Sequence, residues 1–518
     1  MRADLKFYRV IPPHLPTPTR ARGPTLCTLF AVLLLALPPS FARADDAPPA
    51  PAKNAIQLPA DSTTHHTLAL DGKTLDYTAV AGSLPLTDDK GAKQADIFYL
   101  AFFREGVSDV SHRPITYAFN GGPGAAAAYL NIGALGPRAL DFGAQGKPQP
   151  AVNSVQDNAD TWLPFTDLVF IDPVGTGFSR AVNDEAAKKL YRVGPDLDAL
   201  AQIIRLHLTR TQRITSPVFL VGESYGGFRA ARLAHQLATD VGIAPQGVLL
   251  VSPAIEFRLM QGDRYDVLPW ALALPSYAAV TLEEKNALSA DALKDAESFA
   301  LGEYLTGLAA PDGRPPQFYQ RIAALTGLAE PIVERWRGRI PAGIYIKERH
   351  RDAGEVLSRY DGAISAPDPN PSSRYPEDDP VLEGTIAPFT RAFTAYARSE
   401  LGFSTDLAYQ LLNHDVSRHW EWRDGDNGGG RAGLGAGDEL GRALALEPRL
   451  RVLIAHGLTD LTTPYMMSRF VIDHLPSNVT QERVSLKLYA GGHMMYLRTA
   501  SRRRLHDDAQ AFYGGEAR

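Results

Sequence analysis

Short runs of consecutive apolar residues recur in two parts of the chain, with helical patterns between them. The runs are rich in β-branched and aromatic residues and are bounded by Gly, Pro or Asp; they cover 97–103, 115–120, 168–172, 218–221, 248–251, 450–455 and 484–489. Continuous runs of this length are typical of strands buried on both faces of a largely parallel sheet. Helical patterns at 197–208 and 227–237 lie between such runs. This alternation predicts an α/β fold with helices flanking a mostly parallel central sheet.

The stretch 254–447 has a different pattern. It is helical in periodicity, is interrupted by a Pro-rich segment (365–380) and a Gly-rich segment (425–437), and contains almost no strand-like runs. Because strand-like runs resume after it, we predict a core made of 61–253 and 448–518. The stretch between them is then a mainly helical insertion that lies over the sheet as a lid. A separate second domain is the alternative.

The N-terminus has the pattern of a targeting segment. Arginines precede a compact apolar run at 26–37, and Ala42-Arg-Ala44 follows with small residues at a cleavage spacing. This predicts a signal peptide over 1–44, cleaved after Ala44. An uncleaved membrane anchor is the alternative, but spanning a bilayer takes about 20 apolar residues. We therefore expect no stable membrane insertion after cleavage. A Pro/Ala linker is expected over 45–60.

Composition narrows the function classes. Of the 518 residues, 45% are hydrophobic and 21% charged, which excludes a disordered chain, a coiled coil and a polytopic membrane protein. The 53 Lys and Arg against 58 Asp and Glu leave a net charge of −5, so nucleic acid is not an expected partner. The single cysteine, Cys27, lies in the predicted leader. An exported chain without cysteines indicates a bacterial periplasmic or secreted protein.

No metal or cofactor site is predicted. His65 and His66 form an isolated pair in a strand-like polar run, which favours a surface position. The glycines of 426–437 follow no strand-like run and lack the Lys-Ser/Thr of a phosphate-binding loop.

One motif indicates nucleophilic chemistry. Gly222-Glu-Ser224-Tyr-Gly226 stands directly after a strand-like run and directly before a helical pattern. A serine hydroxyl is a weak nucleophile and must project from a sharp turn, which glycines two residues away on each side permit. Ser224 is therefore the candidate nucleophile.

A serine nucleophile needs a base and a carboxylate that orients the base. In this type of fold the chain order is serine, then acid, then histidine. Asp460 lies just past one strand-like run, and His493 lies past the next, after two glycines. We predict that Asp460 orients His493 and that His493 is the base. His456 is the alternative base, although it precedes the acid.

Three further residues have simpler interpretations. Asp473 and His474 fit a solvated helix face, and Asp172 fits a carboxylate that structures a loop.

An oxyanion hole is the second requirement, and backbone N–H groups supply it. One donor is expected from the residue after the serine, Tyr225. The other is expected from Gly122, in the loop Asn120-Gly-Gly-Pro-Gly124 after an earlier strand-like run.

Six motifs occur in an order that resembles one family, the serine carboxypeptidases of the α/β-hydrolase fold. They span about 110–500 and are Asn120-Gly-Gly-Pro-Gly124, Gly136-Pro137, Asp172-Pro-Val-Gly-Thr-Gly-Phe-Ser179, Gly222-Glu-Ser-Tyr-Gly-Gly227, Asp460, and Gly491-Gly-His-Met494. Two more segments resemble the bacterial branch, Leu274-Pro-Ser-Tyr-Ala-Ala279 and Arg359-Tyr-Asp361.

The resemblance implies that Asn120 and Glu223 bind the C-terminal carboxylate of the substrate. A Glu can do so only when protonated, so better peptidase activity is expected at acidic pH. The family's recognition site usually adds a Trp and a second Glu, at positions filled here by Ala118 and Ala134. Arg138 could supply a charge instead; an exposed surface arginine is the simpler interpretation.

The first functional hypothesis is a serine-type carboxypeptidase that releases C-terminal residues of peptides through an acyl-enzyme on Ser224. The alternative is an esterase or acyltransferase that uses the same residues on small molecules such as esters. A non-catalytic peptide-binding protein is the third class, and it is disfavoured because every catalytic position is filled.

Overall fold

The computed structural model describes residues 58–70, 72–149, 151–311, 314–423, 430–480 and 482–515. The predicted signal peptide, Cys27 and most of the predicted linker lie outside these residues. Leu58, the first described residue, is already buried in the hydrophobic core.

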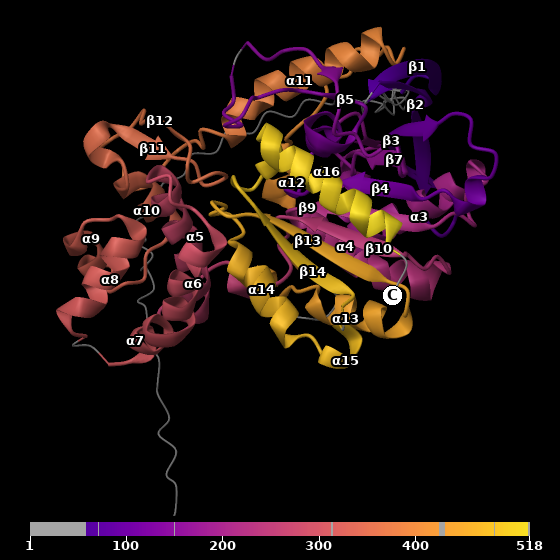
Figure 1. The fold of residues 1–518 in the computed structure, drawn as a ribbon. Coiled ribbons are helices and arrows are strands. Elements are labelled where there is room, and N and C mark those ends of the chain that lie inside the picture. Colours follow the sequence, from indigo (N-terminus) through magenta and orange to yellow (C-terminus); the bar gives the residue numbers. More distant parts are fainter. Residues whose placement is uncertain are drawn as a thin grey trace, which may run out of the picture. The chain divides into compact units, whose positions relative to one another are not determined.

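One sheet of ten strands organises the described residues (Figure 1). Nine strands follow the order β1 (Ser62–Leu70), β2 (Lys73–Thr87), β3 (Lys93–Arg104), β7 (Asp167–Ile171), β4 (Ile115–Phe119), β9 (Val218–Glu223), β10 (Gly247–Val251), β13 (Arg451–Gly457) and β14 (Val484–Tyr489). The short β8 (Arg180–Ala181) pairs with β3, and a small separate sheet joins β5 (Arg138–Ala139) and β6 (Gln156–Asp157).

The sheet is parallel from β7 to β14 and antiparallel from β1 to β7. All seven predicted strands are present, and the prediction of a mostly parallel sheet is confirmed for the part that carries the candidate residues. The only sequence signal for the long β1–β2 hairpin at the edge was the strand-like polar run around His65 and His66. β1 alternates between half-buried and exposed positions, so it has no continuous apolar run to detect.

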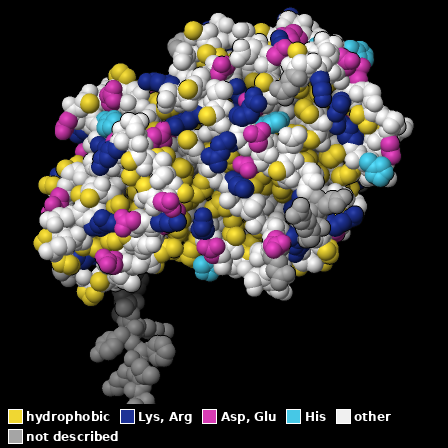
Figure 2. Space-filling view, viewed as in Figure 1, with side chains coloured by type: hydrophobic (Ala, Val, Ile, Leu, Met, Phe, Trp, Pro, Cys, Tyr) yellow, Lys and Arg dark blue, Asp and Glu magenta, His cyan; other side chains and the backbone are white. Residues whose placement is uncertain are grey.

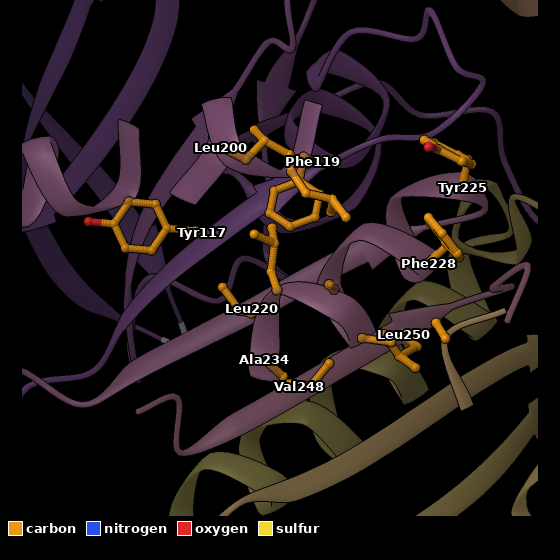
Figure 3. Packing of buried hydrophobic residues seen from close by; sticks show 14 of the residues in the cluster. Tyr117, Phe119, Leu200, Leu220, Tyr225, Phe228, Ala234, Val248 and Leu250 are labelled. Carbon is orange, nitrogen blue, oxygen red and sulfur yellow. The ribbon is translucent and has the colours of Figure 1, made fainter. Parts of the chain in front are cut away.

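The parallel strands bury both faces. Along β10, Val248 and Leu250 join one hydrophobic cluster, whereas Leu249 and Val251 join the other. Successive side chains of a strand point to opposite faces, so two covered faces require an unbroken apolar run. Figure 3 shows Leu220, Val248 and Leu250 gathered with Phe228 and Ala234 on one of these faces.

Helices supply the cover on each face. The first face carries α3 (Val193–Arg210), α4 (Tyr225–Gln236), α13 (Gly437–Leu446) and α14 (Tyr465–His474). The second carries α1 (Ala128–Leu130), α11 (Leu382–Ser399) and α16 (Thr499–Gly514). Three other helices are α2 (Asp184–Leu190), α12 (His414–His419) and α15 (Ser477–Thr480).

The predicted insertion divides into two parts. Residues 268–367, which we call the cap, have a hydrophobic cluster of their own; they contain α5 (Leu268–Glu284), α6 (Ala290–Phe299), α7 (Leu305–Ala309), α8 (Pro316–Thr326), α9 (Glu330–Arg335), α10 (Ala342–Glu348) and the hairpin of β11 (Glu355–Leu357) and β12 (Ser365–Pro367). The later helices α11 and α13 instead pack into the clusters of the core. That the insertion acts as a lid stays a prediction.

The face drawn in Figure 2 intersperses basic and acidic side chains, with hydrophobic side chains between them. Among the described residues, none of the helices combines the length and apolar character that crossing a bilayer requires.

Candidate active site

The carboxyl ends of four parallel strands carry the candidate residues, in two adjacent pairs with β10 between the pairs. Asn120 follows β4, Ser224 follows β9, Asp460 comes soon after β13, and His493 comes soon after β14. The strand register keeps these ends level, since Phe119 pairs with Gly222 and Gly457 pairs with Tyr489. The fold therefore collects at one sheet edge groups that are far apart in the sequence.

Ser224 lies in a sharp turn between β9 and α4. Its φ of 59° and ψ of −122° are conformations that a non-glycine residue rarely adopts. Two hydrogen bonds hold this backbone: the N–H of Ser224 donates to Val251 (2.9 Å), and its carbonyl accepts from Ala254 (3.1 Å). The side chain is partly exposed, as a nucleophile requires.

The glycines around Ser224 are required by close packing. A Cβ on Gly222 would overlap the carbonyl of Gly226, and one on Gly226 would overlap the carbonyl of Phe119. A Cβ on Gly227 would overlap the ring of Pro253. The motif thus lets α4 start directly against the strand ends.

Asp460 and His493 form a buried pair. Oδ2 of Asp460 lies 2.8 Å from Nδ1 of His493. Its other oxygen accepts the N–H groups of Thr462 (2.7 Å) and Thr463 (2.9 Å). The Thr463 hydroxyl donates to Oδ2 at 2.7 Å. The carboxylate is therefore fixed on several sides, and it fixes the imidazole.

The electrostatics of the pair suit a base. Burial disfavours the imidazolium, but the charge and hydrogen bond of Asp460 outweigh burial and raise the pKa of His493. Burial alone would raise the pKa of Asp460, yet His493 and the Thr463 N–H hold it below its usual value. Nε2 of His493 is buried and has no hydrogen-bond partner within the described part of the chain, so Ser224 Oγ is not bonded to it.

Glu223 is buried beside Ser224. Its Oε2 accepts from Asn120 Nδ2 (2.5 Å) and from the Tyr496 hydroxyl (2.8 Å). Burial raises the pKa of Glu223 to about 7, against the opposing charge of His493 and these two hydrogen bonds. The side chain is therefore protonated in much of the acidic range and can then donate a hydrogen bond.

The predicted oxyanion donors come from adjacent segments. Tyr225 opens α4, where the first backbone N–H groups have no partner within the helix. The loop after β4 lies against it, since a Cβ on Gly121 would contact the Tyr225 nitrogen at 2.5 Å. Gly122, with a φ of 99°, has a conformation suited to glycine.

The competing candidates have other roles in the structure. His456 is buried and bonded through Nε2 to Ser468 (2.7 Å), and burial lowers its pKa to about 4. Asp473 and His474 are exposed, as predicted. Asp172 accepts the N–H of Ala127 at 2.8 Å, which confirms its prediction as a loop-structuring carboxylate.

The positions that depart from the family pattern hold no polar group. Ala118 and Ala134 are both buried in the apolar cluster of the second face. Arg138 is only partly exposed and forms ion pairs with Asp157 and Glu400. Arg138 is not among the groups that mainly shift the pKa of Glu223, which are His493, Tyr496, Asn120 and Asp460 besides burial.

Sequence reasoning gave no role to Thr463, Tyr496 or Tyr360, although Tyr360 stands in the segment Arg359-Tyr-Asp361 that resembles the bacterial branch. The first two lie three residues after Asp460 and His493 respectively, so proximity to the motifs was the available signal. Tyr360 is distant in sequence, yet its ring packs edge-on against His493 with centroids 5.0 Å apart.

No group of three or more His, Cys, Asp or Glu side chains placed to hold a metal ion occurs among the residues that the structure describes.

Comparisons with known proteins find relatives for part of the chain. Residues 72–250 match the sequence model of the serine carboxypeptidase family. Serine carboxypeptidase-like 45 of Arabidopsis thaliana is 28% identical over 180 residues, which are 33% of this chain and 35% of that protein. Serine carboxypeptidase-like 35 of the same plant is 32% identical over 146 residues, 28% of each chain. The chain thus spans about a third of the length of these curated relatives.

A solved structure extends the likeness in fold. The crystal structure of Kex1(delta)p, a prohormone-processing carboxypeptidase from Saccharomyces cerevisiae, is 15% identical with a TM-score of 0.51, over 84% of this chain and 91% of that one. At this identity the match concerns the fold, which is that of the α/β-hydrolases. The sequence likeness to the serine carboxypeptidases thus covers residues 72–250, and the likeness in fold covers most of the chain.

Proposed function

We propose that this protein is a serine carboxypeptidase that removes C-terminal residues from peptides. Ser224 attacks the carbonyl carbon of the last peptide bond while Nε2 of His493 takes the hydroxyl proton. The proton passes to the nitrogen of the departing amino acid, leaving the acyl group on Ser224. Water, activated by the same imidazole, then releases the shortened peptide.

The observation that carries the proposal is the 2.8 Å bond from Asp460 to Nδ1 of His493, which leaves Nε2 free. The bond fixes the tautomer that a general base needs, because Nδ1 then carries the proton and Nε2 the lone pair. Ser224 ends a strand at the same sheet edge, in the turn that exposes its hydroxyl.

Glu223 and Asn120 favour cleavage at the C-terminus of a substrate peptide over cleavage in its interior. Glu223 stands next to the nucleophile, and its raised pKa lets it present a proton to the substrate's carboxylate. The side-chain amide of Asn120, which donates to Glu223, offers a second donor beside it. A carboxylate held here places the last peptide bond beside Ser224.

The test is digestion of unmodified and C-terminally amidated peptides of the same sequence, followed by mass spectrometry. We expect stepwise shortening of the free-acid peptides, little cleavage of the amides, and no cleavage by Ser224→Ala. Release from the N-terminus, or cleavage of esters alone, would overturn the proposal. A serine-directed phosphonate should form an adduct at Ser224; no adduct on folded protein would instead favour a peptide-binding protein.

An esterase or acyltransferase is the second candidate. It is favoured by Ala118 and Ala134, which occupy the positions where the resemblance leads us to expect a Trp and a second Glu. Equal turnover of a neutral ester and of its counterpart with a free carboxylate would support this candidate over the peptidase.

We also propose that the protein is exported, with cleavage after Ala44. The support is the order of arginines, apolar run and small residues in 1–44. N-terminal sequencing of protein from the periplasm or medium of an expressing bacterium should begin at Asp45.

A further inference from the structure

The loop that closes the β11–β12 hairpin reaches from the cap to the candidate active site. We call residues 358–362 the hairpin tip. β11 and β12 pair antiparallel, and the bond from Ser358 N–H to Ile364 (2.8 Å) closes the loop. Figure 1 draws this hairpin on the side of the cap, beside α10. The tip contains Arg359-Tyr360-Asp361, which the proposed chemistry does not use.

The tip binds the loop that carries Asp460. The carbonyl of Arg359 accepts the N–H of Leu461 at 3.1 Å, and the N–H of Gly362 donates to the carbonyl of Thr459 at 2.9 Å. Asp361 Oδ1 also accepts the Thr459 hydroxyl at 2.6 Å. Asp460 is thus flanked on both sides by residues bonded to the tip.

The tip also binds the loop that carries His493. The carbonyl of Tyr360 accepts the backbone N–H of His493 at 2.5 Å, and the Tyr360 ring packs edge-on against the imidazole. Gly492 is so close that a Cβ there would overlap the Tyr360 carbonyl. The two loops are therefore bonded to one short segment of the insertion.

Arg498 joins the tip, the histidine loop and the cap. Its Nη2 donates to Asp361 Oδ2 at 2.8 Å, and its Nη1 pairs with Glu283 at the end of α5. Its side chain also packs on Gly491, two residues before His493. Arg498 and Asp361 are both buried, so losing either partner leaves a buried charge without its counter-charge.

The far side of the hairpin is anchored too. Asp379, just before α11, accepts the Ser358 hydroxyl (2.7 Å) and the Arg359 N–H (2.6 Å). Lys347 of α10 pairs with Asp368, next to β12, in a buried contact. These contacts hold the tip from outside the two catalytic loops.

We propose that the hairpin tip is the positioning element of the acid–base pair, and that Asp361 and Arg498 hold His493 and Asp460 in their reactive arrangement. The expected change in kcat rests on the proposed function. Asp361 accepts the Thr459 hydroxyl, and the Arg498 side chain packs on Gly491. They act through the two loops, so the cap contributes to the chemistry by fixing the imidazole.

The test compares Asp361→Asn with Asp160→Asn in the full chain. Asp361→Asn keeps the shape of the side chain and weakens the pairing with Arg498. Asp160 is a matched control, because it is also a buried aspartate paired with a buried arginine, Arg502 of α16 at 3.2 Å, and with the more exposed Arg503. Among the described residues no contact links Asp160 to the tip. We expect kcat of Asp361→Asn to fall about 10²-fold with KM nearly unchanged, since small misplacements of reacting groups have costs of this size. Asp160→Asn should keep the wild-type kcat.

A readout independent of turnover separates positioning from general stability. The proton on Nδ1 of His493 should give a low-field NMR resonance, assigned by its loss in Asp460→Asn. It should shift or broaden in Asp361→Asn and stay in place in Asp160→Asn. Should Asp361→Asn fail to fold, Glu283→Gln tests the same link from the cap side.

Equal falls in kcat for Asp361→Asn and Asp160→Asn, or an unchanged resonance and kcat in Asp361→Asn, would overturn the inference. A wild-type protein that gives the resonance but cleaves no peptide would overturn the proposed function, while the resonance comparison would still test the tip.

Discussion

Two buried carboxyl groups stand at the same sheet edge, Glu223 at the end of β9 and Asp460 after β13, and their surroundings differ. Glu223 meets one amide and one phenol, both neutral, and its pKa rises to about 7. Asp460 meets a histidine, two backbone N–H groups and a hydroxyl, and its pKa falls below the usual value.

The difference teaches that depth of burial does not decide the protonation state in this site. Burial favours the neutral form of both carboxyl groups, and the number and charge of the donors decide whether the anion survives. The region around Ser224 therefore holds an acid that can donate a proton, whereas the histidine region holds a carboxyl group whose lowered pKa favours the anion. These two states fit carboxylate binding and imidazole orientation respectively.

The largest expected effect comes from removing the negative charge of Asp460. Asp460→Asn keeps the shape but removes the charge that selects the Nδ1–H tautomer of His493, so we expect kcat to fall about 10⁴-fold for peptides and esters alike. Steady-state kinetics on both substrate types measure this. A peptide-specific loss would contradict the assigned role.

The second-largest expected effect is a loss of stability when a glycine next to the Ser224 turn is replaced. Gly222→Ala should destabilise the protein by about 3–5 kcal/mol, since its Cβ would overlap the Gly226 carbonyl. Urea unfolding measures the loss. Gly302→Ala is the control: nothing lies within 4 Å of its Cβ position, so stability should stay equal or rise by about 0.5–1 kcal/mol.

Glu223→Gln tests whether protonated Glu223 binds the substrate's carboxylate, because the variant should change how KM depends on pH. In the wild type the fraction of protonated Glu223 falls as pH passes about 7, so KM for free-acid peptides should rise about tenfold between pH 5 and pH 8. A Gln donates at every pH, so KM of the variant should stay nearly flat over this range. A variant that keeps the wild-type pH dependence of KM would refute carboxylate binding by Glu223.

The same substitution changes the pH dependence of stability. The folded state binds the Glu223 proton more tightly than the unfolded state, whose pKa is near 4.5. Stability due to this group is therefore full below that pH and declines as pH rises towards 7. Thermal unfolding of Glu223→Gln should lack this decline. Parallel curves for the two proteins would count against the raised pKa.

The smallest effect is expected away from both carboxyl groups. Arg138→Ala removes partly exposed ion pairs with Asp157 and Glu400, so it should cost about 1 kcal/mol or less and leave KM unchanged. A raised KM for free-acid peptides only would show that Arg138 takes part in recognition.

The candidate site was predictable where the chemistry follows strand ends. Ser224, Asp460 and His493 each come after an apolar run, and parallel strands bring their carboxyl ends to one edge. The Asp460–His493 contact follows from that logic. The free Nε2, and the absence of a bond from Ser224 to it, are details of loop geometry that no residue pattern encodes.

The hairpin tip shows why the remainder could not be predicted. The backbone carbonyl of Tyr360 accepts the N–H of His493, although the two residues are more than a hundred positions apart. Every residue has a backbone carbonyl, so no residue type in the sequence identifies this contact. Likewise the insertion has one helical pattern throughout, yet α5 to α10 bury their apolar faces in the cap while α11 and α13 bury theirs in the core. Periodicity identifies an apolar face but not the surface that covers it.

The course of α16 has a practical consequence. The helix starts beside the histidine loop and ends with Tyr513 bonded to Thr116 (2.6 Å) and stacked on Phe219, near the starts of β4 and β9. A surface tether fused behind Gly515 would thus attach at the edge of the sheet opposite Ser224. Protein immobilised in this way should present Ser224 and its neighbouring loops to the bulk solution, where large substrates can reach them.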